Sequence, residues 1–323
     1  MLRRYLSSFA LVIVTATLSL AGMAQAATVA APAQSGEGLS VSPPLITTSA
    51  NPGQSVVEQI SIRNITGLPL ILSSSTVDFG AKGEDGTPQL LFNETTSTRY
   101  SLKYWIAPVE SPTIQPGATI TVPVTINIPA NAEPGGHYGV VQFSGKPANL
   151  NGNGVSISAS IGVLVLLTVN GNITQHLSPV DTLITQNGRL GTFFQYGPLL
   201  VSQRIRNDGD VHEAPYGKLT VSNLFGGKPI VLNVNPTKGN ILPGSIRKFS
   251  EAIPTKNMFG YYTIKGSLAY GTNKTLVMPE AHFWVIPYTL LIIVVIVLVI
   301  LFFVLRFALR RYNRHVINQA RRR

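Results

Sequence analysis

The stretch TITVPVTINIP, residues 119–129, alternates apolar and polar side chains with a period of two. One face carries branched apolar side chains: Ile120, Val122, Val124, Ile126 and Ile128. The other face carries Thr121, Pro123, Thr125 and Asn127. Successive side chains of a strand point to opposite faces, so the pattern predicts a half-buried β-strand. Pro123 has no N–H to donate to a neighbour, which favours an edge position in the sheet or a ring that points out of the ladder.

Similar patterns run from Leu39 to about Phe283. SVVEQISIRN, residues 55–64, alternates less cleanly. VSISASIGVLVLLTVNG, residues 155–171, is rich in β-branched residues and predicts one long strand or two. This region shows no capped amphipathic helix pattern. Short strands separated by Asn, Gly and Pro turns are typical of sandwiches or barrels.

The region also repeats one order of features. RNITGLP (residues 63–69) and a later Pro116-Gly117 in the first half correspond to RNDGDVHEAP (residues 206–215) and Pro243-Gly244 in the second. Pro presets φ and Gly accepts positive φ, so each Pro-Gly predicts a turn. The Asn- and Gly-containing segments predict hairpin reversals. The repeat predicts an all-β body of two tandem Ig-like β-sandwich domains, residues 39–176 and 177–282.

The N-terminus carries an export signal. Residues 1–26 combine a basic start, an apolar segment and the sequence Ala-Gln-Ala, which predicts a cleaved signal peptide. An uncleaved anchor is the alternative, but the apolar run is short of the roughly 20 residues that a span needs. Residues 27–38 are small and contain Pro and Gly, as expected of a flexible spacer.

The C-terminus predicts a membrane anchor. Residues 283–305 carry no charge and are long enough to cross a bilayer as a transmembrane helix. Trp284 and Tyr288 stand at its start, where interfacial aromatics are expected. The Arg-rich residues 306–323 follow, and the positive-inside rule places this tail in the cytoplasm. The prediction is a single-pass protein of the cell membrane with an extracellular body.

Charge and cysteine content exclude several classes of function. The net charge of +11 is concentrated in the two terminal segments, so the body has no basic stripe for nucleic acid. The chain has no cysteine, which excludes disulfides, cysteine-ligated metals and thiol nucleophiles. An exported chain without disulfides is more typical of a bacterial surface than of a eukaryotic secretory pathway.

The polar clusters fit turns better than catalytic or metal sites. The five histidines show no H-E-x-x-H or H-x-H spacing. NDGDVHE, residues 207–213, has oxygens that calcium prefers but lacks the EF-hand pattern, so a hairpin turn is favoured. Glu84 and Asp85 are adjacent in a loop, whereas an acid–base pair flanks a bond across a cleft. No enzyme activity, cofactor or metal site is predicted.

Aromatic side chains are the candidate partner-binding residues. YSLKYWIAP, residues 100–108, contributes Tyr100, Tyr104 and Trp105, and such rings dominate binding hot spots. The alternative is that Tyr104 or Trp105 fills the core. GGHYG, residues 135–139, adds His137 and Tyr138. The second copy keeps a Gly and an aromatic residue without the His, so His137 is expected to be a loop residue, not a base.

Four segments resemble the WxL-interacting protein family of bacterial surfaces: VSPPLI (41–46), NPGQSVVEQISIRNITGLPLIL (51–72), IQPGATITVPVTINIPANAEPGGHYGVVQFSG (114–145) and SISASIGVLVLLTVNG (156–171). The resemblance covers residues 39–175 best. It implies a peptidoglycan-binding Ig-like domain, a second Ig-like domain that binds host or partner surface proteins, and a C-terminal anchor. It transfers no binding residue by position.

The sequence thus predicts a non-enzymatic, membrane-anchored bacterial surface protein. It is expected to act as a binding or adaptor protein for cell-wall polymer, for other surface proteins, or for both. The alternative is a pilus-assembly-type chaperone or scaffold that donates a strand edge. The C-terminal span argues against that alternative, because such chaperones are soluble in the periplasm.

Overall fold

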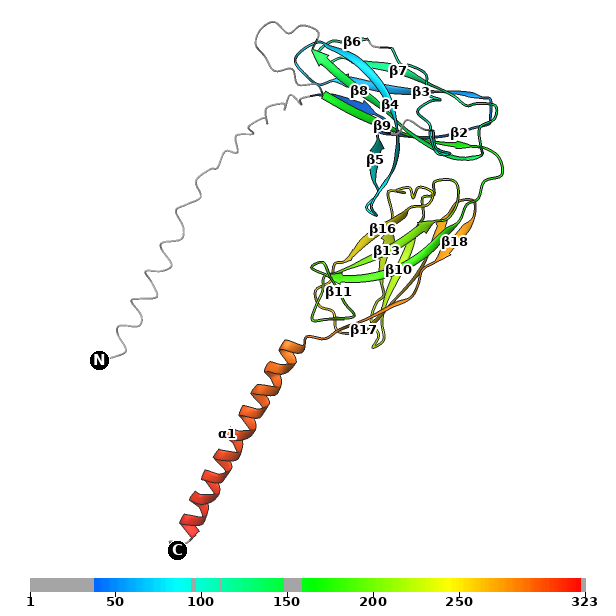
Figure 1. The fold of residues 1–323 in the computed structure, drawn as a ribbon. Coiled ribbons are helices and arrows are strands. Elements are labelled where there is room, and N and C mark those ends of the chain that lie inside the picture. The colour runs from blue at the N-terminus through cyan, green and yellow to red at the C-terminus, as the bar shows by residue number, and fades with distance from the viewer. Residues whose placement is uncertain (1–37, 94–96, 111, 148–158, 321–323) are drawn as a thin grey trace, which may run out of the picture. The chain divides into compact units, whose positions relative to one another are not determined.

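The computed structural model describes residues 38–93, 97–110, 112–147 and 159–320, with side chains given up to Arg311. The predicted signal peptide and the spacer up to residue 37 lie outside these residues. So do the start of the 155–171 stretch and the last residues of the basic tail. The described chain is built of β-strands as far as Val285, and one helix follows (Figure 1).

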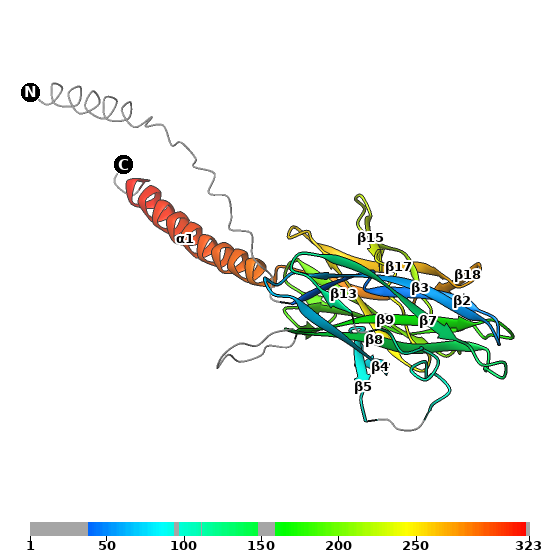
Figure 2. The ribbon, with the colours of Figure 1, turned by 90° about the horizontal axis from the view of Figure 1, so that it is seen from above.

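The first half forms a sandwich of two sheets. One sheet has the order β1 (Leu39–Ser42), β3 (Ser55–Asn64), β7 (Thr119–Asn127). The other has the order β2 (Leu45–Ala50), β9 (Ala159–Val169), β8 (Gly135–Pro147), β4 (Leu70–Lys82), β5 (Thr87–Leu91), with β6 (Thr113–Ile114) paired to β4. Figure 2 shows these strands from above. Fully buried side chains such as Ile60, Val124 and Phe143 fill the space between the sheets.

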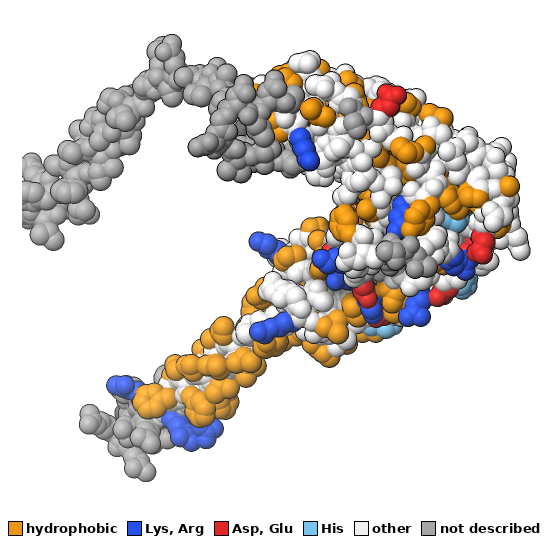
Figure 3. All heavy atoms as spheres, turned by 45° about the horizontal axis from the view of Figure 1, so that its top comes forward, with side chains coloured by type: hydrophobic (Ala, Val, Ile, Leu, Met, Phe, Trp, Pro, Cys, Tyr) orange, Lys and Arg blue, Asp and Glu red, His pale blue; other side chains and the backbone are white. Residues whose placement is uncertain are grey.

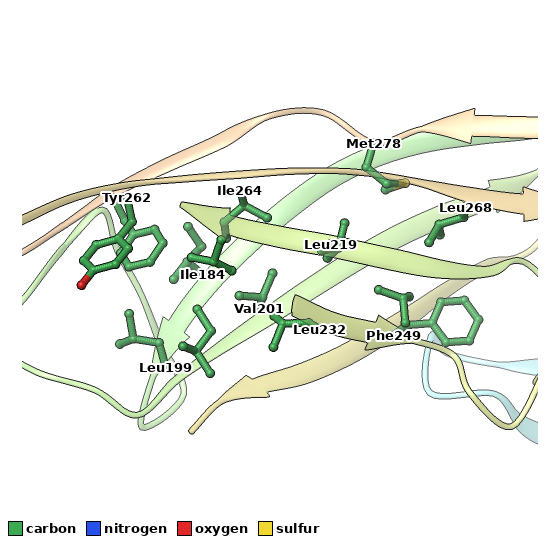
Figure 4. Close-up of a cluster of buried hydrophobic side chains, with 14 of the residues drawn as sticks. Ile184, Leu199, Val201, Leu219, Leu232, Phe249, Tyr262, Ile264, Leu268 and Met278 are labelled. Atoms are coloured by element: carbon green, nitrogen blue, oxygen red, sulfur yellow. The ribbon is translucent and has the colours of Figure 1, made fainter. Parts of the chain in front are cut away.

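The second half forms a second sandwich around a separate core. One sheet has the order β11 (Arg189–Leu190), β10 (Leu177–Gln186), β13 (Leu199–Asn207), β16 (Ile246–Ile253). The other has the order β12 (Phe193–Phe194), β19 (Ala281–Val285), β17 (Gly260–Tyr270), β14 (Tyr216–Asn223), β15 (Ile230–Val234), with β18 (Lys274–Val277) paired to β17. Val201, Leu219 and Ile264 belong to the buried cluster between the sheets (Figure 4). The predicted fold class, two tandem Ig-like sandwiches and a C-terminal apolar helix, is confirmed.

Strand β7 matches its prediction residue by residue. Val122, Val124 and Ile126 are buried, and their polar neighbours face outward. Pro123 lies opposite Gln59 of β3, and β7 is the last strand of its sheet. An edge position fits a residue that has no N–H to donate.

The predicted hairpin reversals are wrong, because these segments carry the chain from one sheet of a sandwich to the other. β3 and β13 end at Asn64 and Asn207, and the next strands, β4 and β14, belong to the opposite sheets. Both Asn side chains are fully buried. A side chain that bonds locally replaces the ladder bonds that a hairpin would supply at such a corner.

The two corners have the same hydrogen bonds. Asn64 Nδ2 donates to the carbonyls of Leu68 (2.7 Å) and Ile114 (3.0 Å), and its Oδ1 accepts from Thr66 N. Asn207 Nδ2 donates to the carbonyls of Val211 and Ile241 (2.8 Å each), and its Oδ1 accepts from Gly209 N.

The Pro-Gly turns close the same corners. Gly117 N donates to Asn64 O at 3.0 Å, and Gly244 N donates to Asn207 O at 2.8 Å. The φ angles of the two glycines are 71° and 72°, in the left-handed region that a β-carbon disfavours. The repeat seen in the sequence is therefore one corner built twice, with Asn joined to Pro-Gly.

Helix α1 (Tyr288–Ala320) begins later than the predicted start of the span at Phe283. Phe283 and Val285 are fully buried in the second core, and β19 pairs with β17. Trp284 therefore packs beside Phe193 and Tyr261 and does not begin the span. From Tyr288 to Arg311 the helix is long and apolar enough to cross a membrane. Its exposed side chains are apolar, with cations toward the C-terminal end (Figure 3).

Candidate functional site at the junction of the sandwiches

Strand β9 is covered on both faces, which explains its unbroken apolar sequence. Val163, Val165 and Leu167 belong to the first core. Leu164 and Leu166 point to the opposite face. There a smaller buried cluster, Phe79, Tyr138, Val140 and Leu166, packs against Leu242 of the second sandwich. The outer face of this sheet is thus the junction between the two sandwiches.

A cavity of about 240 Å³ lies at this junction. Leu45, Phe79 and Leu166 form its wall on the first sandwich, and Leu242 and Arg247 belong to its wall on the second. The described lining residues are largely apolar, and their charged members are the cations Lys238 and Arg247. A cavity of this composition suits an apolar group that carries an acceptor or a negative charge.

Arg247 is held firmly in the cavity wall. Its Nη1 donates to Asn240 O at 2.6 Å, and its guanidinium lies 5.3 Å from the centre of the Phe249 ring. Gly86 leaves room for it, because a β-carbon there would overlap the guanidinium and the φ of Gly86 is 83°. Burial lowers the pKa of Arg247. Among the described residues its buried Nε has no hydrogen-bond partner, which is unusual for a buried polar atom.

Arg204 of β13 fastens the first sandwich to the second. Its Nε donates to Glu84 Oε2 at 2.7 Å, and its Nη2 donates to Oε1 of the same carboxylate. Its Nη1 donates to Asp181 Oδ2 at 2.8 Å. Glu84 lies in the β4–β5 turn, and its carbonyl also accepts from Lys248 N at 2.7 Å. The hydrogen bond from Arg204 lowers the pKa of Glu84, as expected of a bidentate charge-assisted pair.

We expect Arg204→Met to lower the free energy of unfolding by about 1 kcal/mol, because it removes a bidentate pair that is partly shielded from water. The matched control is Lys265→Met. Its ion pair with Glu280 (2.8 Å) is more exposed, so a loss under about 0.5 kcal/mol is expected. Urea unfolding of both variants measures the difference. Equal losses would show that Arg204 does not fasten the junction.

The Gly135-Gly136 pair allows the first sandwich to pack closely against the second. Gly136 N donates to Asp210 O at 2.8 Å. A β-carbon on Gly135 would come within 3.0 Å of the same oxygen, and the φ of Gly135 is 131°. A β-carbon on Gly136 would overlap the hydroxyl of Tyr138. This pair therefore contacts the chain's own second sandwich.

His137 is a strand residue, not the loop residue that was expected. It lies in β8 and is 4% exposed. Its Nδ1 and Nε2 lie 3.3 Å and 3.1 Å from the carbonyls of Ser101 and Glu133. Its ring lies 4.2 Å from that of Trp105. Burial lowers the pKa of His137, so a neutral, packed imidazole is favoured.

Tyr138 is also buried, and it packs against the second sandwich. Its ring meets the edge of the His212 ring at 5.7 Å and lies 6.0 Å from Phe79. Burial lowers the pKa of His212 to about 4. Both His137 and Tyr138 are thus buried, although Tyr138 borders a groove, and partner binding by the two stays a prediction.

The three remaining aromatic candidates are separated in space. Tyr100 lies 6.2 Å from Tyr138, and both line a groove of about 380 Å³ beside Leu242 and Pro243. Trp105 is half-buried against the first core, as the alternative predicted. Tyr104 is 59% exposed, with the Lys103 ammonium over its ring. Of these three, Tyr100 is thus the one that the fold brings to the junction, beside Tyr138, and partner binding by the three stays a prediction.

The polar segment 207–213 forms hydrogen bonds at the junction of the two sandwiches. Asp210 Oδ1 accepts from Thr174 N at 2.8 Å, while its carbonyl binds Gly136. In the residues that the structure describes, no group of three His, Asp or Glu side chains is placed to hold a metal ion. The carboxylate of Glu84, which the sequence places in a loop beside Asp85, binds Arg204.

Comparison with known proteins gives structural matches only. No family model matches the chain, and no curated protein matches it. The class 5 fimbriae chaperone CfaA is similar at 14% identity, over 77% of this chain and 100% of that one, with a TM-score of 0.37.

Two structures of complexes are similar at the same level. The CsuC–CsuE chaperone–tip adhesion subunit pre-assembly complex of Acinetobacter baumannii matches at 13% identity, over 74% of this chain and 97% of that one, with a TM-score of 0.35. The Salmonella enterica SafA pilin in complex with the SafB chaperone matches at 10%, over 77% and 96%, also with 0.35. With TM-scores this low, these matches do not indicate what this chain binds.

Proposed function

We propose that this protein is a non-enzymatic, membrane-anchored surface protein that binds a segment of another surface protein at the junction of its two sandwiches. The observation that supports this most is the cavity between Leu166 and Leu242, with Arg247 in its wall. The apolar lining favours an apolar side chain. The guanidinium of Arg247 in the cavity wall favours a neighbouring carboxylate or carbonyl oxygen.

The size of the cavity favours a polypeptide segment over a free small molecule. At about 240 Å³ it is smaller than the roughly 300–1,000 Å³ typical of small-molecule pockets. The groove lined by Tyr100 and Tyr138 lies next to it, since Phe79 and Leu242 line both. An extended segment could place one side chain in the cavity and the next along the groove.

A second candidate is the chaperone or scaffold that pairs a sheet edge with a strand of its partner. One observation favours it: β2 and β5 are the two ends of the sheet that faces the junction, with no further described strand beyond either of them. Open edges accept a partner strand through main-chain hydrogen bonds. This mode would depend little on Arg247.

The membrane anchor and the surface location form part of the proposal. The apolar length of α1 and the cations that follow it support a span with the C-terminus in the cytoplasm. The resemblance to WxL-interacting proteins, with peptidoglycan as a ligand of the first domain, stays a prediction.

The test is capture of surface proteins and of wall polymer by the full chain held in detergent micelles. Arg247→Met is expected to reduce capture of a surface protein about tenfold, the size of a lost charge-assisted hydrogen bond. Lys265→Met, at an exposed ion pair in the same sandwich, is expected to leave it unchanged. Urea unfolding checks that both variants are folded.

Two results would contradict the proposal. Capture of wall polymer alone, equal for both variants, would favour the peptidoglycan prediction. The other result is capture of a surface protein that Arg247→Met leaves unchanged but Gln89→Pro in β5 abolishes. This result would favour strand pairing at the sheet edge.

A further inference from the structure

The loops at one end of the second sandwich gather where α1 begins. Register places three connections at this end: residues 187–198, 224–229 and 254–259. Leu199 pairs with Ile253, Asn223 pairs with Tyr262, and Gly260 pairs with Val285 at the end of β19. Figure 1 shows β11, within the first of these connections, at the end from which α1 leaves.

The start of the helix is bonded to this end. Only Ile286 and Pro287 separate β19 from α1. Ile286 N donates to Phe194 O at 2.8 Å. Thr289 Oγ1 of the first helical turn donates to Gln195 Oε1 at 3.2 Å. The first turn of the helix therefore lies beside the connection 187–198, at the same end of the second sandwich.

This end exposes large apolar side chains that the fold does not require on its surface. Six of them are more than half exposed: Leu190, Phe193, Tyr196, Leu224, Phe225 and Phe259. Phe193 is 70% exposed and Phe225 is 68% exposed. A soluble sandwich usually buries such rings or replaces them with polar residues.

The charges of the three connections have one sign. They contain Arg189, Lys228 and Lys256, and no Asp or Glu. The opposite end of the same sandwich carries Asp208, Asp210 and Glu213. Cations beside exposed aromatic rings are typical of protein surfaces that rest on lipid headgroups.

The length of the helix points to the same contact. From Tyr288 to Leu305 it has 18 residues without charge, which span about 27 Å at 1.5 Å per residue. That is close to the thickness of a hydrocarbon core of about 30 Å. With the uncharged segment beginning at Tyr288, the residues just before it lie near the boundary between acyl chains and headgroups in the proposed span.

We propose that this end of the second sandwich is a lipid-binding surface. Phe193, Phe225 and Phe259 insert among the headgroups of the bilayer that α1 spans, and Arg189, Lys228 and Lys256 bind lipid phosphates. The inference rests on the proposed membrane anchor. The anchor can hold without it, because a span by itself does not require loop contact.

The test places one tryptophan probe on the proposed surface and a second one away from it, in the full chain. Trp105→Phe and Trp284→Phe remove the two native tryptophans. Phe225→Trp then reports on the proposed surface, and Val277→Trp, at a 72% exposed position on β18, is the matched control. Both chains are reconstituted into vesicles whose lipids carry bromine near the headgroup. Flotation of the vesicles shows whether the chain is anchored.

We expect quenching at least about twofold stronger for Phe225→Trp than for Val277→Trp, since interfacial side chains lie within the outer few ångströms of the bilayer. Equal quenching in chains that float would overturn the inference and leave the anchor standing. Chains that do not float would overturn both. If quenching is weak and the chain forms a dimer that Phe225→Ser dissociates, the inference is overturned. The surface would then bind a second copy of the chain.

A second measurement uses the parent chain and avoids any folding defect of the variants. Backbone hydrogen exchange of residues 224–228 is expected to slow when detergent is replaced by vesicles containing anionic lipid. Exchange of residues 208–211, at the opposite end, is expected to stay unchanged. Equal changes at the two ends would contradict a lipid contact confined to the proposed surface.

Discussion

Asn207→Ala is expected to lower the free energy of unfolding by about 3 kcal/mol, since a buried polar group left without its partner costs about 1–3 kcal/mol. The substitution removes the donor to Val211 O and Ile241 O and the acceptor for Gly209 N. The Asn207 side chain is fully buried, so water cannot replace it without opening the corner. Urea unfolding at neutral pH measures the loss.

Asn64→Ala is the matched variant in the first sandwich and is expected to lose a similar amount. Asn233→Ala, at an exposed position on β15, is the control, and a change within about 0.5 kcal/mol is expected. A loss at Asn207 no larger than at Asn233 would show that the corner does not depend on the Asn side chain.

Acid is expected to destabilise the protein by up to about 3 kcal/mol through His212. The pKa of His212 is lowered to about 4 by burial, against about 6.5 in an unfolded chain. As the pH falls, the unfolded chain therefore takes up this proton first. The stabilisation is complete above about pH 6.5 and is lost as the pH falls toward 4.

Neighbouring groups modify this pH dependence. Burial also lowers the pKa of His137, which adds a loss of the same sign. Burial raises the pKa of Glu213, and this acts in the opposite direction, because the folded carboxyl group takes up its proton first. The net loss is therefore expected to differ from the contribution of His212 by the balance of these two opposite effects.

His212→Phe separates the histidine from these neighbours. It retains a ring against Tyr138 and removes the proton. We expect it to reduce the loss of stability between pH 7 and pH 5 by about half, measured by urea unfolding at both values. His176→Phe, at an exposed position, is the control. Parallel pH profiles for parent and His212→Phe would exclude His212 as the source.

The architecture could be predicted from the sequence wherever short-range patterns, such as alternation or turn motifs, determine the structure. The alternation in residues 119–129 placed β7 and the face that it buries. The repeated Pro-Gly turns indicated two units of one kind. The Asn segments were misread as hairpins, because sequence does not show that the strands on either side belong to different sheets.

The start of the helix was misplaced for a related reason. The residues of β19 are as apolar as the helix that follows, and composition does not separate a buried strand from a span. Pro287 was the available signal, because proline is favoured at the first turn of a helix.

The candidate site was harder to predict because its contacts join distant segments. Glu84 and Arg204 lie in different sandwiches, and nothing in either segment indicates the other. Arg247 stands in an alternating strand, where a cation normally faces water. The Gly135-Gly136 pair did offer a signal in the sequence. The second copy lacks this pair, which indicates a contact that only the first copy makes.

The two faces of β9 determine how the body can come apart. One face of the strand belongs to the first core and the other to the cluster that packs on Leu242. Unfolding of the first sandwich therefore removes the surface against which the second one packs. Unfolding of either half is expected to lower the stability of the other. A partner bound at the junction would stabilise both halves at once, so its binding would appear as added resistance to unfolding across both sandwiches.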